Sequence, residues 1–250
     1  MLYKQNQSYE LDEKLFKNPT SEYRAAPFWA WNCKLNKDIL NEQIDIFKKM
    51  GFGGFHMHSR IGMSTPYLKD EFMGLIKFCT QKAEQENMLA YLYDEDRWPS
   101  GSAGGYVTKT HKYRQRYLIF SQNSREHFSL DEAINSSKDY LLAVFDVVLN
   151  EKGELKSYHT ISENDTAIGT KWYAYVHTHD ESPWHNNQTY VDTLNKEAID
   201  EFIKITYEAY QSAVGDKFDK IIPSIFTDEP QCKPKIPLSF ADSTDDAQLP

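Results

Sequence analysis

A short apolar run ends in three carboxylates in the stretch Leu89-Ala-Tyr-Leu-Tyr-Asp-Glu-Asp-Arg-Trp-Pro-Ser-Gly-Ser-Ala-Gly-Gly105. Apolar residues bounded by such turn signals predict a buried strand over residues 89–93. A carboxylate is costly to bury without partners. We therefore expect the three acids at the end of this strand, Asp94, Glu95 and Asp96, either to face solvent or to take part in a binding or catalytic site. The neighbouring Arg97 and Trp98 favour a binding site, since planar hydrogen-bond donors and aromatic faces suit a ring-shaped polar ligand such as a sugar. A solvated acidic loop is the alternative.

Strand and helix signals alternate on the N-terminal side of this stretch. Pro27-Phe-Trp-Ala-Trp-Asn32 predicts an aromatic strand, and Gly51-Phe-Gly-Gly-Phe-His-Met-His-Ser-Arg60 predicts a second strand entered through glycines. Apolar residues at helical spacing lie between them, behind a capping Asn36, and a further helix is expected to open at Thr65-Pro66. Repeats of roughly 25–35 residues with this rhythm are typical of βα units and a parallel sheet.

The alternation of strand and helix signals stops after residue 105 and resumes further along the chain. Residues 106–188 hold strand-like runs and the turn Asn150-Glu-Lys-Gly153, which predict a β-rich insertion. A helix capped by Asn195 and a strand over residues 221–226 follow, whereas no strand is expected in residues 231–250. We count five βα-type strands, near residues 28, 53, 90, 191 and 223.

These signals together predict an α/β fold of the TIM-type (β/α)8 class. A closed barrel needs eight strands, so we expect this chain to hold only the first four or five βα units of a longer protein. Residues 1–22 are expected to form an irregular lead-in, and residues 23–250 a partial catalytic barrel that carries the β-rich insertion.

Composition excludes several classes of function. The net charge is −9 and no basic stripe occurs, which argues against a nucleic-acid partner. No apolar run has membrane-spanning length, and the N-terminus lacks the apolar stretch of a secretory signal, so we expect a cytoplasmic protein with no membrane partner. Cys33, Cys79 and Cys232 lie far apart and predict neither a disulfide framework nor a Cys-x-x-Cys metal site.

Polar side chains gather where the predicted strands end. The carboxyl ends of parallel strands lie at one edge of a sheet, which is where ligands bind in such folds. We therefore expect one common site. Its candidate members are Trp31, Asn32, His56, His58, Arg60, Asp94, Glu95, Asp96, Trp98, Asp192, Asp228 and Glu229.

The spacing of His56 and His58 points both rings to one face of a strand. One interpretation is a zinc-type pair, completed by His177, His179 and Asp228. The other is that both rings hydrogen-bond to a ligand or to nearby acids.

Asp228 and Glu229 end the last predicted strand, directly before Pro230. A carboxyl group held among aromatic walls has a raised pKa and can act as a general acid. Glycoside hydrolysis needs such an acid and a second carboxylate, whose separation decides between retention and inversion. The alternative is that either acid only pairs with Arg60 or Arg97.

Four segments in this order resemble the family-106 α-L-rhamnosidases: Pro27–Asn32, Gly53–Arg60, Tyr93–Gly101 and Phe226–Pro230. The resemblance spans about residues 23–232, the N-terminal part of such a catalytic barrel. It implies a (β/α)8 fold, cleavage of a terminal deoxy-sugar such as L-rhamnose with inversion, and a calcium ion near the sugar hydroxyls. It implies Glu229 as the general acid, and it leaves the position of the partner carboxylate open.

The sequence thus predicts a glycoside hydrolase that acts on an oligosaccharide or glycoside, with no certain cofactor. The alternatives are a metal-dependent barrel hydrolase built on His56 and His58, and a non-catalytic carbohydrate-binding segment. The expected catalytic residues are Glu229, Asp228 and Glu95. The expected sugar-binding residues are Trp31, Asn32, His56, His58, Arg60, Asp94, Asp96 and Trp98.

Overall fold

The computed structural model describes residues 9–185, 187–240 and 243–250. The chain divides into two compact units. The first unit comprises the chain up to Gly104 together with Asp200–Pro230, and the second comprises Gly105–Ile199 together with Gln231–Pro250. The chain therefore enters each unit twice.

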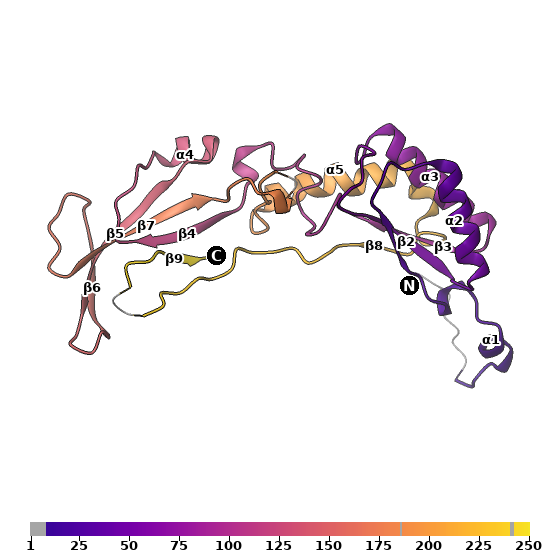
Figure 1. Ribbon diagram of the computed structural model, residues 1–250, viewed down its shortest axis with the longest axis horizontal. Helices are drawn as coiled ribbons and strands as arrows, with labels where there is room; N and C mark the ends of the chain where they lie inside the picture. Colours follow the sequence, from indigo (N-terminus) through magenta and orange to yellow (C-terminus); the bar gives the residue numbers. More distant parts are fainter. Residues whose placement is uncertain (1–8, 186, 241–242) are drawn as a thin grey trace. The chain divides into compact units, whose positions relative to one another are not determined.

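The first unit is built on a four-stranded parallel sheet of order β1-β2-β3-β8 (Figure 1). Its strands are β1 Phe28–Trp31, β2 Gly54–Ser59, β3 Leu89–Tyr93 and β8 Ile225–Phe226. The mixed α/β class is confirmed, but the described strands form an open sheet, so a TIM barrel is not observed. The strand predicted near residue 191 is wrong, because Val191 only bridges antiparallel to Arg114 in the second unit.

The register of the parallel sheet separates two kinds of side chain. Trp29 and Trp31 point to the side that carries α2 and α3, where their rings meet Phe47 at 5.4 Å and Phe72 at 5.7 Å. Alternate residues point to the other side. Since Phe28 pairs with His56 and Ala30 with His58, that other side gathers Phe28, Ala30, His56, His58, Tyr91, Tyr93 and Phe226.

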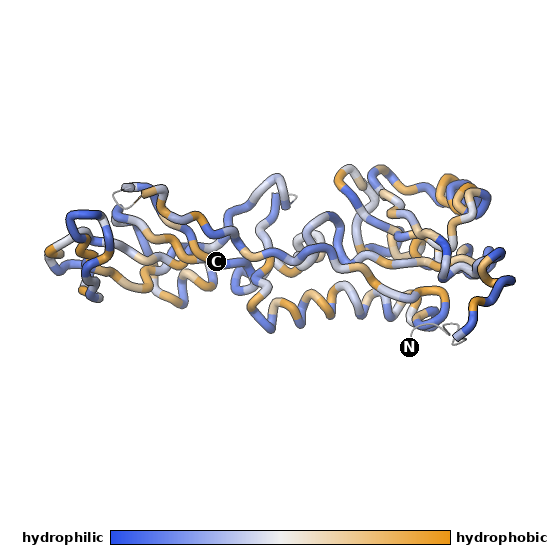
Figure 2. Tube along the Cα trace, turned by 90° about the horizontal axis from the view of Figure 1, so that it is seen from below, coloured by the Kyte–Doolittle hydropathy of each residue, from blue (hydrophilic) through white to orange (hydrophobic). Residues whose placement is uncertain are grey.

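Helices connect the parallel strands and have the predicted apolar faces. They are α2 Lys37–Lys49, α3 Asp70–Gln85 and α5 Lys196–Val214, the last running across the boundary between the units. The Asn36 side chain caps α2 by accepting from Asp38 N and Ile39 N, as predicted. The second helix begins at Asp70 rather than at Thr65-Pro66. Hydrophobic and hydrophilic residues alternate along α5 (Figure 2).

The second unit contains a five-stranded antiparallel sheet of order β6-β5-β7-β4-β9. Its strands are β4 Arg116–Ser121, β5 Tyr140–Leu149, β6 Leu155–Ile161, β7 Thr170–Thr178 and β9 Ala247–Leu249. The turn between β5 and β6 holds Gly153 at φ 77°, as its Asn-x-x-Gly sequence indicates. The tail contradicts the expectation of no strand there, because β9 pairs with β4 (Figure 1).

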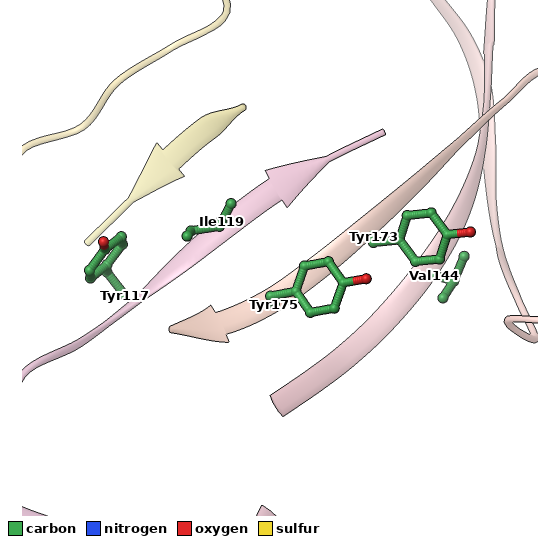
Figure 3. Packing of buried hydrophobic residues seen from close by; sticks show 5 residues of the cluster. All are labelled: Tyr117, Ile119, Val144, Tyr173 and Tyr175. Atoms are coloured by element: carbon green, nitrogen blue, oxygen red, sulfur yellow. The ribbon is translucent and has the colours of Figure 1, made fainter. Parts of the chain in front are cut away.

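The core of the second unit is aromatic. Tyr117 and Ile119 on β4, Val144 on β5, and Tyr173 and Tyr175 on β7 are all buried and form one cluster (Figure 3). The rings of Tyr173 and Tyr175 stack with centroids 6.0 Å apart. Alternation along each strand places these residues on the same face of the sheet.

Short elements complete the fold. They are α1 Glu13–Lys17, η1 Ser21–Tyr23, η2 His111–Tyr113, α4 Leu130–Ser136, η3 Pro183–His185 and η4 Gly215–Lys217. Within the described parts of the chain, no helix combines the length and the apolar character needed to cross a lipid bilayer.

Candidate functional site

The loop after β3 is wound around the carboxylate of Glu95. Its Oε2 accepts hydrogen bonds from the backbone N–H groups of Gly101 (3.0 Å), Ser102 (2.8 Å) and Ala103 (2.7 Å). Its Oε1 accepts from the N–H groups of Gly104 and Asp96. The glycine-rich segment is therefore a bend built on a buried side chain, and both oxygens of Glu95 are engaged inside the protein.

The electrostatics of Glu95 combine opposing effects. Burial, reinforced by the neighbouring Asp96 carboxylate, raises the pKa of Glu95, whereas the backbone N–H groups favour its charged form. Burial also raises the pKa of Asp96, which is opposed by the Arg97 guanidinium, whose Nε lies 3.3 Å from Asp96 Oδ2. The acid cluster is thus held by local donors rather than left in solvent.

Asp94 is fully buried and joins three segments of the first unit. Its Oδ1 accepts from the Ser100 hydroxyl at 2.6 Å, and its Oδ2 accepts from the hydroxyls of Thr227 (2.6 Å) and Tyr207 (2.8 Å). Burial raises the pKa of Asp94, and these three donors act against that rise. Asp94 therefore binds other parts of the chain instead of facing a ligand.

An aromatic-walled pocket of about 320 Å³ opens on the side of the sheet away from α2 and α3. It is lined by Phe28, Ala30, His58, Arg60, Phe226 and Asp228. The Phe28 ring lies 5.0 Å from the rings of both His56 and His58 and 5.3 Å from Phe226. The two histidines stack on the tyrosines beside them, His56 on Tyr91 and His58 on Tyr93, at 4.3 and 3.9 Å.

His58 and Asp228 face one another across this pocket, with His58 Nε2 3.9 Å from Asp228 Oδ2. His58 Nδ1 lies 3.1 Å from the carbonyl oxygen of Ser59, which can only accept, so Nδ1 carries the proton and Nε2 is an acceptor. Burial and the Arg60 charge lower the pKa of His58 to about 4. At neutral pH the pocket thus presents an uncharged imidazole to the carboxyl group.

The half-buried Asp228 has a raised pKa. Burial and the adjacent Glu229 carboxylate raise it, while the Arg60 guanidinium opposes them. Its position in the pocket, against aromatic walls, is the environment that keeps a proton on a carboxyl group.

Glu229 leaves the strand in a different direction. Its side chain is exposed, and its Oε2 accepts from the Trp98 indole N–H at 3.2 Å. Its backbone is left-handed, with φ 42°, a conformation that costs a non-glycine residue free energy and recurs at functional positions. Of the two adjacent acids, only Asp228 lines the pocket.

Other predicted members lie elsewhere. The Trp31 side chain is buried against Phe72, on the helix-bearing side of the sheet, and Asn32 is exposed after β1. In the second unit, His177 pairs with Asp139 at 2.6 Å, and Asp192 accepts from the N–H of Leu194. The structure therefore brings together His56, His58, Arg60 and Asp228, with Trp98 against Glu229.

A metal centre finds little support in this arrangement. Within the described residues, no group of three or more His, Cys, Asp or Glu side chains is placed to hold a metal ion. Calcium takes six to eight oxygen ligands, and the described carboxylates are not gathered into such a set.

Sequence reasoning missed several contributors to the site. Phe28 and Phe226 form walls of the pocket, and Ser100, Tyr207 and Thr227 hold Asp94. The two phenylalanines point to the same side of the sheet as the two histidines. This can be deduced only when the pairing register of the strands is known. Tyr207 lies within an apolar helical pattern and carries no signal of its own.

Comparison with known proteins gives a weak structural likeness. No family model matches the chain, and no curated protein matches it. Among solved structures, it is similar to a rhamnosidase from Novosphingobium sp. PP1Y, with a TM-score of 0.38 and 16% identity over 55% of this chain. The matched part spans 16% of that rhamnosidase chain.

Proposed function

We propose that the chain carries the sugar-binding and proton-donating part of a glycoside hydrolase, with α-L-rhamnosidase-like specificity for a terminal deoxy-sugar. The observation that carries the proposal is the half-buried Asp228 carboxyl group, which faces the acceptor nitrogen of neutral His58 between aromatic walls. A sugar fits such a pocket because its C–H faces pack on aromatic rings while its hydroxyls donate to acceptors.

The polar groups of the pocket complement a polyol. His58 Nε2 can accept a hydrogen bond from a sugar hydroxyl, and Asp228 Oδ2, 3.9 Å from that nitrogen, faces the same part of the pocket. The Arg60 guanidinium supplies N–H donors for a sugar oxygen at the same pocket. Shape and hydrogen-bond pattern thus favour the same class of ligand.

The chemistry assigns the proton to Asp228. Its raised pKa keeps it protonated to higher pH than an ordinary aspartic acid, as a general acid requires. It would give that proton to the glycosidic oxygen as the C–O bond breaks, while water attacks the anomeric carbon and loses a proton to a second carboxylate. Glu229 is our candidate for that second carboxylate. The family resemblance implies Glu229 as the acid, but its exposed position makes Asp228 the better proton donor.

The test is a panel of 4-nitrophenyl glycosides, including the α-L-rhamnoside, with the purified chain and its Asp228→Asn and Glu229→Gln variants. We expect Asp228→Asn to lower kcat/KM at least roughly 100-fold, the size typical of losing a general acid. Asp216→Asn, which changes an exposed aspartate of the first unit, is the matched control and should leave the rate unchanged.

Binding of L-rhamnose, measured by NMR titration, separates the remaining outcomes. Saturable binding without cleavage of any glycoside would replace the hydrolase by the non-catalytic carbohydrate-binding alternative. Absence of both binding and cleavage would refute the sugar site itself, as would cleavage that Asp228→Asn leaves intact.

A further inference from the structure

The exit of β8 is held by few backbone contacts. β8 consists of only Ile225 and Phe226, and its ladder with β3 ends where Asp94 N donates to Phe226 O at 3.2 Å. Asp228 lies two residues beyond the end of that ladder. Because a short segment past the last ladder bond is free to move, something else must fix the Asp228 carboxyl group in the pocket.

Ser100 fixes the backbone of Asp228 at both of its polar groups. The Ser100 N–H donates to the Asp228 carbonyl oxygen at 2.9 Å, and the Asp228 N–H donates to the Ser100 hydroxyl oxygen, also at 2.9 Å. The same hydroxyl donates to Asp94 Oδ1 at 2.6 Å. Asp94 thereby orients the hydrogen of the Ser100 hydroxyl. A lone pair of the Ser100 oxygen then accepts from the Asp228 N–H.

The second oxygen of Asp94 secures the residue next to Asp228 and a helix. Thr227 donates its hydroxyl to Asp94 Oδ2 at 2.6 Å, and Tyr207 on α5 donates to the same oxygen at 2.8 Å. Hydrogen bonds to an ionised acceptor are short and stronger than neutral ones, so this buried carboxylate is a firm anchor. Its three hydroxyl donors come from the loop after β3, the exit of β8 and α5.

We propose that Asp94 is a positioning residue for Asp228, acting through Ser100 and Thr227, and that Tyr207 extends the anchor to α5. Asp94 touches no ligand in this scheme, because its oxygens are fully buried and taken by three hydroxyls. A role for Asp94 in catalysis rests on the proposed function, whereas the claim that Asp94 holds Asp228 in place does not depend on it.

The experiment compares Tyr207→Phe with Tyr210→Phe. Both variants remove one hydroxyl from α5, but Tyr210 donates to the backbone oxygen of Tyr93 and not to Asp94. Asp94→Asn is the second test variant, because an amide keeps the shape but cannot accept all three donors. Hydrogen exchange of the Asp228 amide and an NMR titration of the Asp228 carboxyl group are the readouts.

After correction for any change in global stability, we expect hydrogen exchange of the Asp228 amide to accelerate about tenfold or more in Tyr207→Phe and in Asp94→Asn. In Tyr210→Phe it should change only as far as global unfolding changes. The Asp228 pKa should fall toward its ordinary value in Tyr207→Phe, since a released carboxyl group gains solvent. In Asp94→Asn it should fall further, because the Asp94 charge that raises the Asp228 pKa is also removed. Unchanged exchange and an unchanged Asp228 pKa in Tyr207→Phe and Asp94→Asn would overturn the positioning role.

Kinetics keep the two proposals apart. If the wild-type chain cleaves a glycoside, Tyr207→Phe should lower kcat about tenfold with KM changed less than twofold, because the sugar still binds while its acid is misplaced. If the wild-type chain cleaves none, the proposed function fails, and the exchange and titration results still decide whether Asp94 positions Asp228.

Discussion

The two units place their polar groups in different ways. In the first unit, parallel strands leave their sheet at one edge, and Glu95, His58 and Asp228 all belong to segments at or next to that edge. In the second unit, antiparallel strands alternate in direction, so loops and their polar groups divide between two edges. The antiparallel sheet instead carries aromatic side chains on its faces, including an apolar pocket of about 430 Å³ lined by Phe120, Phe145 and Trp172 among others. Strand direction thus explains why the polar strand ends gather at one edge in the first unit and divide between two edges in the second.

The largest effect should come from Glu95, which supports the edge loop of the first unit. Glu95→Gln places an amide N–H₂ against backbone N–H donors, and we expect it to lower the free energy of unfolding by roughly 4–5 kcal/mol. Urea denaturation measures this. Glu13→Ala, at an exposed carboxylate, should leave the midpoint nearly unchanged. A Glu95→Gln protein as stable as wild type would show that the loop keeps its conformation without the Glu95 carboxylate.

The second unit should respond most to loss of an aromatic side chain from its sheet. Tyr175 is fully buried, and its hydroxyl accepts from Arg125 N at 2.9 Å. Tyr175→Ala should cost roughly 3–4 kcal/mol, because it leaves a cavity and an unpaired N–H group. Tyr158→Ala, at an exposed ring on the edge strand β6, is the control for urea denaturation. Equal losses from the two variants would contradict the assignment of the core to this face.

The polar edge of the first unit should show a pH dependence that comes from His58. Its folded pKa of about 4 lies below the usual value near 6.5, so the unfolded chain takes up a proton first as the pH falls. Stability should be complete above about pH 6.5 and should decline by at most roughly 3 kcal/mol down to about pH 4. The difference between wild type and His58→Gln isolates this group, with the exposed His159→Gln as control. Parallel pH profiles for wild type and His58→Gln would refute a buried neutral imidazole.

The smallest effect should come from a turn of the second unit. Gly153 has φ 77°, and Gly153→Ala should cost about 1 kcal/mol because alanine resists the left-handed region. Glu151→Ala in the same turn is the control for thermal unfolding. A stabilised Gly153→Ala protein would mean that the hairpin does not need this geometry.

The sequence predicted the parallel sheet better than the site. The strands over residues 28–31, 54–59 and 89–93 are marked by apolar runs between glycines, caps and turns, and those local signals are confirmed. The false strand near residue 191 and the missed β9 have a common cause. Pairing partners distant in sequence decide whether a short extended segment joins a sheet, and no local pattern reports them.

The same limit applies to the acids. The sequence showed that Asp94, Glu95 and Asp96 could not be left buried without partners, but not that the partners are protein groups. Backbone N–H groups of the following loop surround Glu95, and hydroxyls from residues more than a hundred positions away surround Asp94. Asp228, in contrast, keeps a side of its carboxyl group open to the pocket, which only the folded strands reveal.

The discontinuous path of the chain sets an order of events during synthesis on the ribosome. Thr227 lies 133 residues after Asp94, so the nascent chain carries the β3 edge and the Asp94 carboxylate long before β8, Tyr207 and Thr227 are made. Strand β4 likewise waits for β9, near residue 250, to cover one of its sides. Translation that stalls soon after residue 104 would release a fragment with an unpaired parallel edge, the kind of surface that chaperones bind and that seeds aggregation.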